Sequence, residues 1–256
     1  MKNRKSLIIA IDVGNTNISI GLFRKSVLKS KISIATRSSR PVLRRHLMRL
    51  KHLGAHPDAI IICSVVPDMN KVLSFELRKI LKVKPVFCGE DLIVPIKNLY
   101  KHPESVGQDR LVTAYAAARF YGQPLIILDF GTAVTIEAVS KGRAYLGGII
   151  TPGLKISLEA LSQKTALLPS LSLSKKPAKL PLIGRTTSQS IYSGLFFGFS
   201  CMIKELIKEV KKKIGKNAKV AATGGDIKII RRFLAGSIDI VDEDLTLKAL
   251  NLLAQI

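Results

Sequence analysis

Two segments of this chain share one pattern of apolar and polar positions. LIIAIDVGNTNISIGLF, near the start, and LIILDFGTAVTIEAVS, in the middle, each run from apolar residues through an acid and a glycine-containing turn into alternating apolar residues. An apolar run closed by Asp-x-Gly and followed by alternation with a period of two predicts a strand, a tight turn and a second strand. The sequence therefore contains two copies of one strand–turn–strand unit, with acids at Asp12 and Asp129.

The elements predicted around each copy also follow one order, with three strands, a helix, a strand and a helix. The first half gives strands 7–12, 17–23 and 26–35, helix 41–53, strand 59–66, helix 69–81 and strand 84–88, then a connector at 89–106 and an alanine-rich helix at 108–121. The second half gives strands 125–129, 133–139 and 143–150, helix 153–164, a loop at 165–186, helix 188–214, strand 218–222, helix 226–234, strand 237–241 and helix 243–255. The repeated order predicts a duplicated α/β domain, each copy a mixed sheet flanked by helices.

The longest predicted helix, 188–214, is amphipathic. Its apolar positions recur at three- and four-residue steps, with Lys and Glu on the opposite face. They are Leu195, Phe199, Met202, Ile203, Leu206, Val210 and Ile214. This stripe predicts a helix in a core or a subunit interface rather than one that crosses a membrane.

The net charge is the unusual feature of the composition. The chain has 256 residues, 47% of them hydrophobic, and a formal net charge of +23. Such a charge favours polyanionic partners. However, the basic residues are spread along the chain, with mild concentration at 24–51 and 204–219, and no zinc finger or aromatic-interleaved basic strand accompanies them. We therefore expect a basic surface that attracts anionic substrates, and no specific nucleic-acid recognition.

The first residues, MKNRKSLIIAI, have the basic and apolar character of a signal peptide. Asp12, Asn15 and Asn17 interrupt the apolar stretch, and no small-residue cleavage site follows. No apolar run approaches the roughly 20 residues that span a membrane. We expect a buried first strand in a cytoplasmic protein without a membrane partner.

The cysteines match no known framework. Cys63, Cys88 and Cys201 are far apart and odd in number. This spacing fits neither a zinc site nor a set of disulfides. We expect buried, reduced thiols.

Residues 12–19 have the composition of a phosphate-binding turn. Glycine lets the backbone approach a ligand closely, and small polar side chains and amides can surround phosphate oxygens. A carboxylate beside phosphates needs a bridging cation. A plain hairpin turn also favours Gly and Asn, but it does not explain an acid at the end of a buried strand. The second turn, with Gly131 and Thr132, has the same character. Together the two turns predict a nucleotide held from both sides of a cleft.

Familiar nucleotide motifs are absent. The sequence contains no G-x-x-x-x-G-K-[ST] and no G-x-G-x-x-G that opens a helix. Instead, Gly107-Gln-Asp109-Arg110 precedes the alanine-rich helix. Asp109 could cap that helix, or it could accept a hydroxyl proton as general base while Arg110 binds a substrate carboxylate. Phosphoryl transfer needs little more from a protein than cations, donors and an in-line hydroxyl.

Five motifs occur in the order found in the type III pantothenate kinases, a family of the acetate kinase/sugar kinase/heat-shock/actin superfamily. They are Asp12-x-Gly14-Asn15-Thr16, Gly107-x-Asp109-Arg110, Asp129-x-Gly131-Thr132-Ala133-x-Thr135, Gly148-x-Ile150-x-Pro152-Gly153 and Thr187-x-x-Ser190-Ile-x-Ser193-Gly194. The resemblance covers essentially the whole chain. It implies actin-like (ribonuclease H-like) domains at 1–115 and 116–256 with a nucleotide cleft between them. It also implies ATP-dependent phosphorylation of pantothenate to 4'-phosphopantothenate, the first step of coenzyme A biosynthesis.

The same resemblance implies roles for individual residues. The ATP phosphate loop would comprise Asp12, Val13, Gly14, Asn15, Thr16, Asn17, Ile18 and Ser19, with Thr132 as a further ATP contact. Pantothenate would contact Tyr100, Gly107, Gln108, Asp109, Arg110 and Thr187, the last across a homodimer interface. Asp109 would accept the proton, and Asp129 would bind a monovalent cation, K⁺ or NH₄⁺, while Mg²⁺ accompanies the nucleotide. Glu137 stands where the family usually has Asp.

Two other functions fit parts of the sequence. A non-catalytic accessory factor on the same scaffold could use the basic surface to bind nucleic acid, but it would have no need for the acids of the two turns or for Asp109 and Arg110. Another sugar-like kinase would keep the phosphate turns and phosphorylate a different acceptor. Only the residues matched at Tyr100, 107–110 and Thr187 specify pantothenate.

Overall fold

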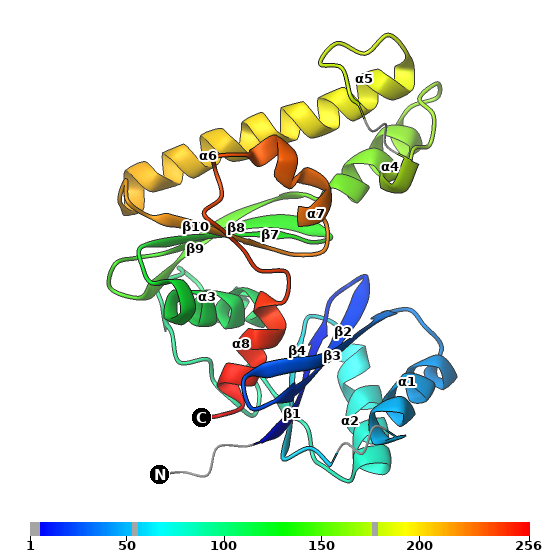
Figure 1. The fold of residues 1–256 in the computed structure, drawn as a ribbon, viewed down its shortest axis with the longest axis vertical. Coiled ribbons are helices and arrows are strands. Elements are labelled where there is room, and N and C mark those ends of the chain that lie inside the picture. The colour runs from blue at the N-terminus through cyan, green and yellow to red at the C-terminus, as the bar shows by residue number, and fades with distance from the viewer. Residues whose placement is uncertain (1–5, 53–55, 176–178) are drawn as a thin grey trace. The chain divides into compact units, whose positions relative to one another are not determined.

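The computed structural model describes residues 6–52, 56–175 and 179–256 and forms two compact units (Figure 1). The first unit comprises Met1–Phe120 and Asp244–Ile256, and the second comprises Tyr121–Glu243. Residues 1–5 and the predicted end of the first helix at residue 53 lie outside the described residues. The limits 1–115 and 116–256 expected for the actin-like domains stay a prediction.

A mixed sheet forms the centre of the first unit. Its strand order is β3-β2-β1-β4-β5. The strands are β1 (Leu7–Val13), β2 (Asn17–Arg24), β3 (Val27–Ala35), β4 (Ala59–Ser64) and β5 (Val86–Phe87). β2 is antiparallel to β1 and β3, whereas β4 is parallel to β1 and β5. Residues 60–63 of β4 are buried, as the continuous apolar run predicts for a strand covered on both faces.

Helices cover this sheet. α1 (Arg40–His52) and α2 (Pro67–Leu81) pack on each other, and their leucines join a core with Ile9, Ile11 and Ile60 of the strands. α8 (Leu245–Leu253), the last helix of the chain, packs on β1, β2 and β4, so the C-terminus returns to the first unit. α3 (Gln108–Tyr121) is buried from Leu111 to Ala118, where alanines allow close packing. The connector before it holds the short strand β6 (Lys97–Asn98) and a 3₁₀ turn at Pro103–Ser105.

The sheet of the second unit repeats the first. Its strands are β7 (Leu125–Phe130), β8 (Ala133–Val139), β9 (Ala144–Pro152), β10 (Lys219–Thr223) and β11 (Ile240–Val241). Within this unit they run in the order β9-β8-β7-β10-β11. β8 is antiparallel to β7 and β9, and β10 is parallel to β7 and β11. Order and direction therefore match the first sheet strand by strand, and the predicted duplication is confirmed.

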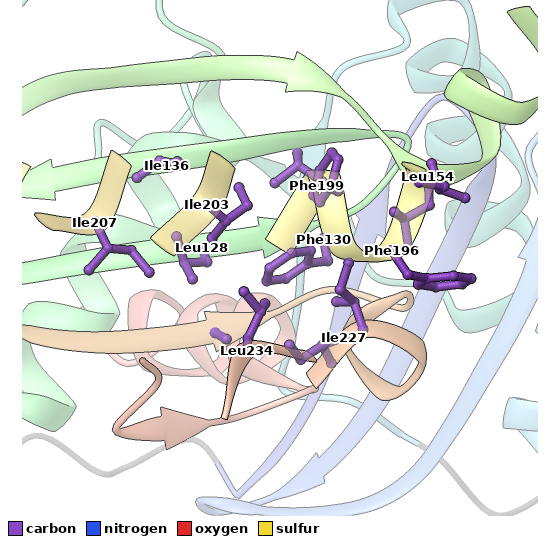
Figure 2. Packing of buried hydrophobic residues seen from close by; sticks show 14 of the residues in the cluster. Leu128, Phe130, Ile136, Leu154, Phe196, Phe199, Ile203, Ile207, Ile227 and Leu234 are labelled. Atoms are coloured by element: carbon purple, nitrogen blue, oxygen red, sulfur yellow. The ribbon is translucent and has the colours of Figure 1, made fainter. Parts of the chain in front are cut away.

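One long helical run dominates the second unit. α5 (Thr187–Ser193) continues through a π turn (Gly194–Gly198) into α6 (Phe199–Ile214), so the predicted helix forms with a local widening that its apolar pattern did not predict. Figure 2 shows Ile203 and Ile207 of α6 facing Leu128 and Ile136 of the sheet. Among the described residues, Thr187–Ile214 is long and apolar enough to cross a membrane by length and composition. Because its apolar face packs into this core, we assign it as a core helix.

The remaining elements are short. α4 (Leu154–Lys164) follows β9, and a 3₁₀ turn at Leu173–Lys175 lies in the following loop. The predicted helix 226–234 is α7 (Ile227–Ile230) continued by a 3₁₀ turn at Arg231–Leu234.

The three cysteines differ in exposure. Cys63 and Cys88 are buried, but Cys201 is exposed. The expectation of three buried thiols is therefore wrong for Cys201, since this residue lies on the outer face of the amphipathic helix α6.

Candidate active site

The first turn, residues 12–19, links two central strands. Asp12 is the penultimate residue of β1, in register with Ser19 on β2 and with Cys63 on β4. Its carboxyl group is therefore held by paired strands on each side.

Backbone hydrogen bonds close this first turn. The Gly14 N–H donates to the Asn17 carbonyl oxygen at 3.0 Å. The side chains of Asn15, Thr16 and Asn17 are exposed, whereas those of Val13 and Ile18 belong to the core. Val13 and Ile18 can therefore reach a ligand only through their backbone.

The second turn, residues 129–132, has the same construction. Asp129 is the penultimate residue of β7, in register with Thr135 on β8 and Thr223 on β10. The Gly131 N–H donates to the Ala133 carbonyl oxygen at 3.1 Å, and Thr132 is exposed. Asp129 is thus the counterpart of Asp12 in the duplicated sheet.

Glycines pack closely around the Asp129 carboxylate. Gly224 follows β10 with a φ of +92°, and a methyl group there would lie 2.5 Å from Asp129 Oδ1. A methyl group at Gly131 would lie 3.7 Å from the same Asp129 oxygen, an ordinary van der Waals contact. A side chain at Gly224 would therefore overlap the Asp129 carboxylate and the Phe130 backbone, so the backbone comes very close to this acid.

Asp226 lies beside the second turn, although the sequence analysis gives it no role. Its N–H donates to the Phe130 carbonyl oxygen at 3.0 Å, so it adjoins the end of β7. Burial raises the pKa of its carboxyl group, and Lys155 opposes that rise. The Gly224-Gly225-Asp226 segment after an apolar strand was the available signal.

The candidate base lies at the start of α3. The Arg110 N–H donates to Asp109 Oδ1 at 2.9 Å, so the acid does bond a backbone group of the first helical turn. The Thr113 hydroxyl donates to the Asp109 carbonyl oxygen at 2.7 Å. A methyl group at Gly107 would lie 2.5 Å from Asp109 Oδ1, so a side chain there would displace the carboxylate from this position. Asp109 lies inside the first turn of α3 rather than at its cap. This position allows it to act as a proton acceptor as well, because a carboxylate can accept several hydrogen bonds.

The residues expected to bind pantothenate gather around this helix start. The Arg110 guanidinium lies 5.9 Å from the centre of the Tyr100 ring, within range of a cation–π interaction. The Tyr100 N–H donates to Asn98 Oδ1 at 3.0 Å. The Gln108 side chain packs closely on Gly89, whose φ is +88°. The first unit therefore assembles Tyr100 and residues 107–110 in one place.

The buried thiol of Cys63 is affected by the charges of both Asp12 and Asp109. The pKa of Cys63 is raised well above its ordinary value, first by burial and then by the charges of Asp12, Cys88 and Asp109. Both carboxylates are therefore close enough to Cys63 to act on it electrostatically. Within the first unit, Cys63 is thus near both Asp12, with which it pairs across β1 and β4, and the candidate base Asp109.

The remaining predicted residues lie in the second unit. Thr187 is exposed and begins α5, where the Gln189 N–H donates to the side chain of Thr186. Glu137 is buried, and the Tyr145 hydroxyl donates to its Oε2 at 2.7 Å. The carboxylate of Glu137 is thus directed into the protein, unlike a residue of an exposed turn.

Protein side chains alone do not form a metal cage here. Over residues 6–52, 56–175 and 179–256, no group of three or more His, Cys, Asp or Glu side chains could hold an ion. Single carboxylates such as Asp12 and Asp129 suit hard cations that complete their coordination with phosphate oxygens and water. The donor set therefore fits a cation that arrives with a nucleotide.

Comparison with known proteins gives this arrangement a family. The profile described as Type III pantothenate kinase matches residues 8–209. A curated type III pantothenate kinase of Dehalococcoides mccartyi is 35% identical over 97% of each chain. The chain belongs to the type III pantothenate kinase family. As a member it is an enzyme of the family's reaction, ATP-dependent phosphorylation of pantothenate for coenzyme A biosynthesis, and the comparisons give no support to a non-catalytic accessory factor.

Solved structures agree on the fold. The ethanolamine utilization protein EutJ of Carboxydothermus hydrogenoformans matches with a TM-score of 0.58 at 15% identity, covering 99% of this chain and 90% of that one. A candidate N-acetylglucosamine kinase of Porphyromonas gingivalis matches with a TM-score of 0.53 at 11% identity, covering 97% and 98%. These likenesses show the fold alone. Together with the duplicated sheets they confirm the expected actin-like (ribonuclease H-like) architecture.

Proposed function

We propose that this type III pantothenate kinase transfers the γ-phosphoryl group of ATP to the primary hydroxyl of pantothenate with Asp109 as general base. The observation that carries the assignment is the position of Asp109 in the first turn of α3, beside Arg110 and near Cys63, the residue paired with Asp12. A carboxylate there can accept the hydroxyl proton as the oxygen attacks phosphorus. Transfer leaves 4'-phosphopantothenate and ADP.

The two turns bind the phosphates of ATP in this proposal. In the first turn, Asp12, Gly14, Asn15, Thr16, Asn17 and Ser19 offer backbone and side-chain groups, while Val13 and Ile18 contribute backbone only. In the second turn, Thr132 offers an exposed hydroxyl. Oriented amides and hydroxyls of this kind stabilise phosphate charge without rearranging during the reaction.

Pantothenate carries a carboxylate, and Arg110 supplies the matching cation. The planar guanidinium can bind a carboxylate through two parallel hydrogen bonds. Tyr100, which lies against Arg110, and the backbone at Gly107 and Gln108 would bind the rest of the acceptor. Their place beside Asp109 supports an acceptor whose hydroxyl reaches the base.

Two cations complete the proposed site. Mg²⁺ would arrive with ATP, and Asp129, next to the glycines Gly131 and Gly224, would hold K⁺ or NH₄⁺. Such cations neutralise charge that develops on the phosphates during transfer. The protein's part is to keep the Asp129 carboxylate fixed by its paired strands.

A cytoplasmic homodimer is the proposed assembly. In the loop before α5, the adjacent residues Leu182 and Ile183 are 69% and 82% exposed. Exposed apolar residues close to one another favour a protein interface. Thr187 follows them by a few residues, which supports a contribution of this hydroxyl to the pantothenate site of the partner subunit.

The catalytic assignment is tested by replacing one oxygen of the base. With ATP, Mg²⁺, K⁺ and pantothenate, the wild-type protein should release ADP, and Asp109→Asn should lower kcat by roughly 10²–10⁴-fold. Glu104→Gln is the matched control, since Glu104 is an exposed acid in the same connector. Wild-type kcat in Asp109→Asn would refute the general base. Salt-sensitive DNA binding without ADP release would favour the accessory factor, and preferred turnover of a sugar would favour another kinase.

The shared site is tested by mixing inactive subunits. If Thr187 acts across the dimer, exchange between Asp109→Asn and Thr187→Ala subunits creates heterodimers with one intact site, and about a quarter of wild-type activity returns on random exchange. If Thr187 acts within its own subunit, every site in the mixture lacks one residue and no activity returns.

A further inference from the structure

Thr36, which follows strand β3, forms two hydrogen bonds with the backbone of the first turn. Its side chain is only 7% exposed. The Thr36 N–H donates to the Thr16 carbonyl oxygen at 2.9 Å, and the Thr36 hydroxyl donates to the Gly14 carbonyl oxygen at 2.6 Å. One residue thus fixes two carbonyl groups of the turn.

The second unit repeats the backbone half of this arrangement. Asn17 pairs with Ala35 in the first sheet, and Ala133 pairs with Pro152 in the second, so Thr36 and Gly153 are counterparts. Accordingly, the Gly153 N–H donates to the Thr132 carbonyl oxygen at 3.2 Å. In both units, the residue after the third strand is bonded to the turn after the first.

The side chains differ because the turns differ in length. The closing hydrogen bond joins Gly14 to Asn17 in the first turn but Gly131 to Ala133 in the second, which is one residue shorter. A methyl group at Gly153 would lie 2.3 Å from the Thr132 oxygen and 2.6 Å from the Gly131 oxygen. The shorter turn therefore leaves no room for a side chain. The longer one admits the threonine hydroxyl as an extra donor.

The direction of these bonds matters for a phosphate ligand. In a trans peptide, the carbonyl and the following N–H point to opposite sides. Fixing the carbonyls of Gly14 and Thr16 toward Thr36 therefore turns the N–H groups of Asn15 and Asn17 away from it. A carbonyl that rotated outward would instead present negative charge to a phosphate. Prearranged N–H groups stabilise an anion without reorganisation.

We propose that Thr36 is a positioning residue for ATP, keeping the peptide groups of the first turn in the orientation that binds phosphate. This inference rests on the proposed role of residues 12–19 as the ATP phosphate loop. Because its bonds end on Gly14 and Thr16, Thr36 affects ATP and leaves pantothenate binding unchanged.

The test compares ATP binding in variants that keep or lose the hydroxyl. Calorimetric titration with Mg·ATP needs no acceptor, so it is independent of pantothenate turnover. Thr36→Val has nearly the same shape without the donor and should raise the Kd and KM for ATP by about 5–30-fold, with the KM for pantothenate unchanged. Thr36→Ser restores the donor and should return both ATP values toward wild type.

Ser200→Ala is the matched control. The Ser200 hydroxyl is 3% exposed and donates to the Phe196 carbonyl oxygen at 2.6 Å, within the helical run of the second unit. The Ser200→Ala variant loses the same kind of buried hydrogen bond and should leave the Kd for ATP unchanged. A general loss of stability would affect both variants, whereas positioning affects Thr36→Val alone.

Each outcome decides a separate point. A folded Thr36→Val protein with the wild-type Kd for ATP overturns the inference. Should that variant not fold, Thr36→Cys, with a weaker donor of similar size, takes its place under the same criterion. A wild-type protein that binds ATP but does not phosphorylate pantothenate refutes the proposed function and leaves the Thr36 comparison valid. One that binds no ATP overturns both.

Discussion

Asp12 and Asp129 occupy the same position in two copies of one sheet. Each is the penultimate residue of the first strand and is paired on both sides, Asp12 with Ser19 and Cys63 and Asp129 with Thr135 and Thr223. The two positions differ in the paired residue on the strand parallel to the first, which is Cys63 on β4 and Thr223 on β10. A thiol stands beside Asp12, whereas a hydroxyl stands beside Asp129. Hard cations such as K⁺ prefer oxygen ligands, so the second position is the better candidate for the monovalent ion.

Replacing Asp129 should remove a dependence on the monovalent cation. If Asp129 holds the proposed monovalent cation, wild-type turnover should rise when K⁺ or NH₄⁺ replaces Na⁺ at constant ionic strength, because a carboxylate site discriminates ions by size and coordination. The Asp129→Ala variant should have the same low turnover rate in all three salts. Coupled ADP assays measure the ratio of the turnover rate in K⁺ or NH₄⁺ to the rate in Na⁺ for each protein. Indifference of the wild-type rate to the ion would refute the assignment.

Two adjacent glycines offer a direct comparison at this site. Gly224 has a φ of +92° and a missing methyl position 2.5 Å from Asp129 Oδ1, whereas a methyl group at Gly225 would meet nothing within 4 Å. Gly224→Ala should lower the free energy of unfolding by about 1–3 kcal/mol, from backbone strain and overlap, and should reduce activity. Gly225→Ala should stay within about 0.5 kcal/mol of wild type. Urea denaturation measures both; equal losses would contradict the close approach.

The hydrogen bond between Tyr145 and Glu137 should contribute to stability. Both side chains are buried, and Tyr145→Phe removes a donor from the carboxylate at 2.7 Å. We expect the free energy of unfolding to fall by about 1–3 kcal/mol, because the carboxylate stays buried with one donor fewer. A double-mutant cycle with Glu137→Gln isolates the pair. A coupling energy of zero would show that the bond contributes nothing to folding.

The sequence predicted what depends on local periodicity. The alternation after Asp12 and Asp129 identified both strand pairs, and the repeated order of elements identified the duplicated sheets. Contacts between distant segments had no such signal. Nothing in the sequence around Thr36 indicates that its hydroxyl reaches Gly14, 22 residues earlier, and nothing around Glu137 indicates its burial against Tyr145.

The sequence pattern also did not predict where backbone segments approach each other closely. Gly153 could be recognised in a motif, but only the backbone geometry shows that it contacts Gly131 and Thr132. The return of α8 to the first unit is likewise a tertiary choice, because an apolar helix can cover either of two similar sheets.

The carboxyl group of Asp226 should make stability depend on pH. Burial raises its pKa above the ordinary value of 3.8, so the folded protein binds this proton more tightly than the unfolded chain does. The group therefore favours folding below pH 3.8, and this contribution is lost as the pH rises through the folded pKa. Asp226→Asn should accordingly have a higher Tm than wild type at pH 7, with the gap closing in acid. Lys155→Met should widen the gap, because Lys155 opposes the rise of the pKa. Scanning calorimetry across pH measures these differences, and a Tm gap that grows toward low pH would contradict the raised pKa.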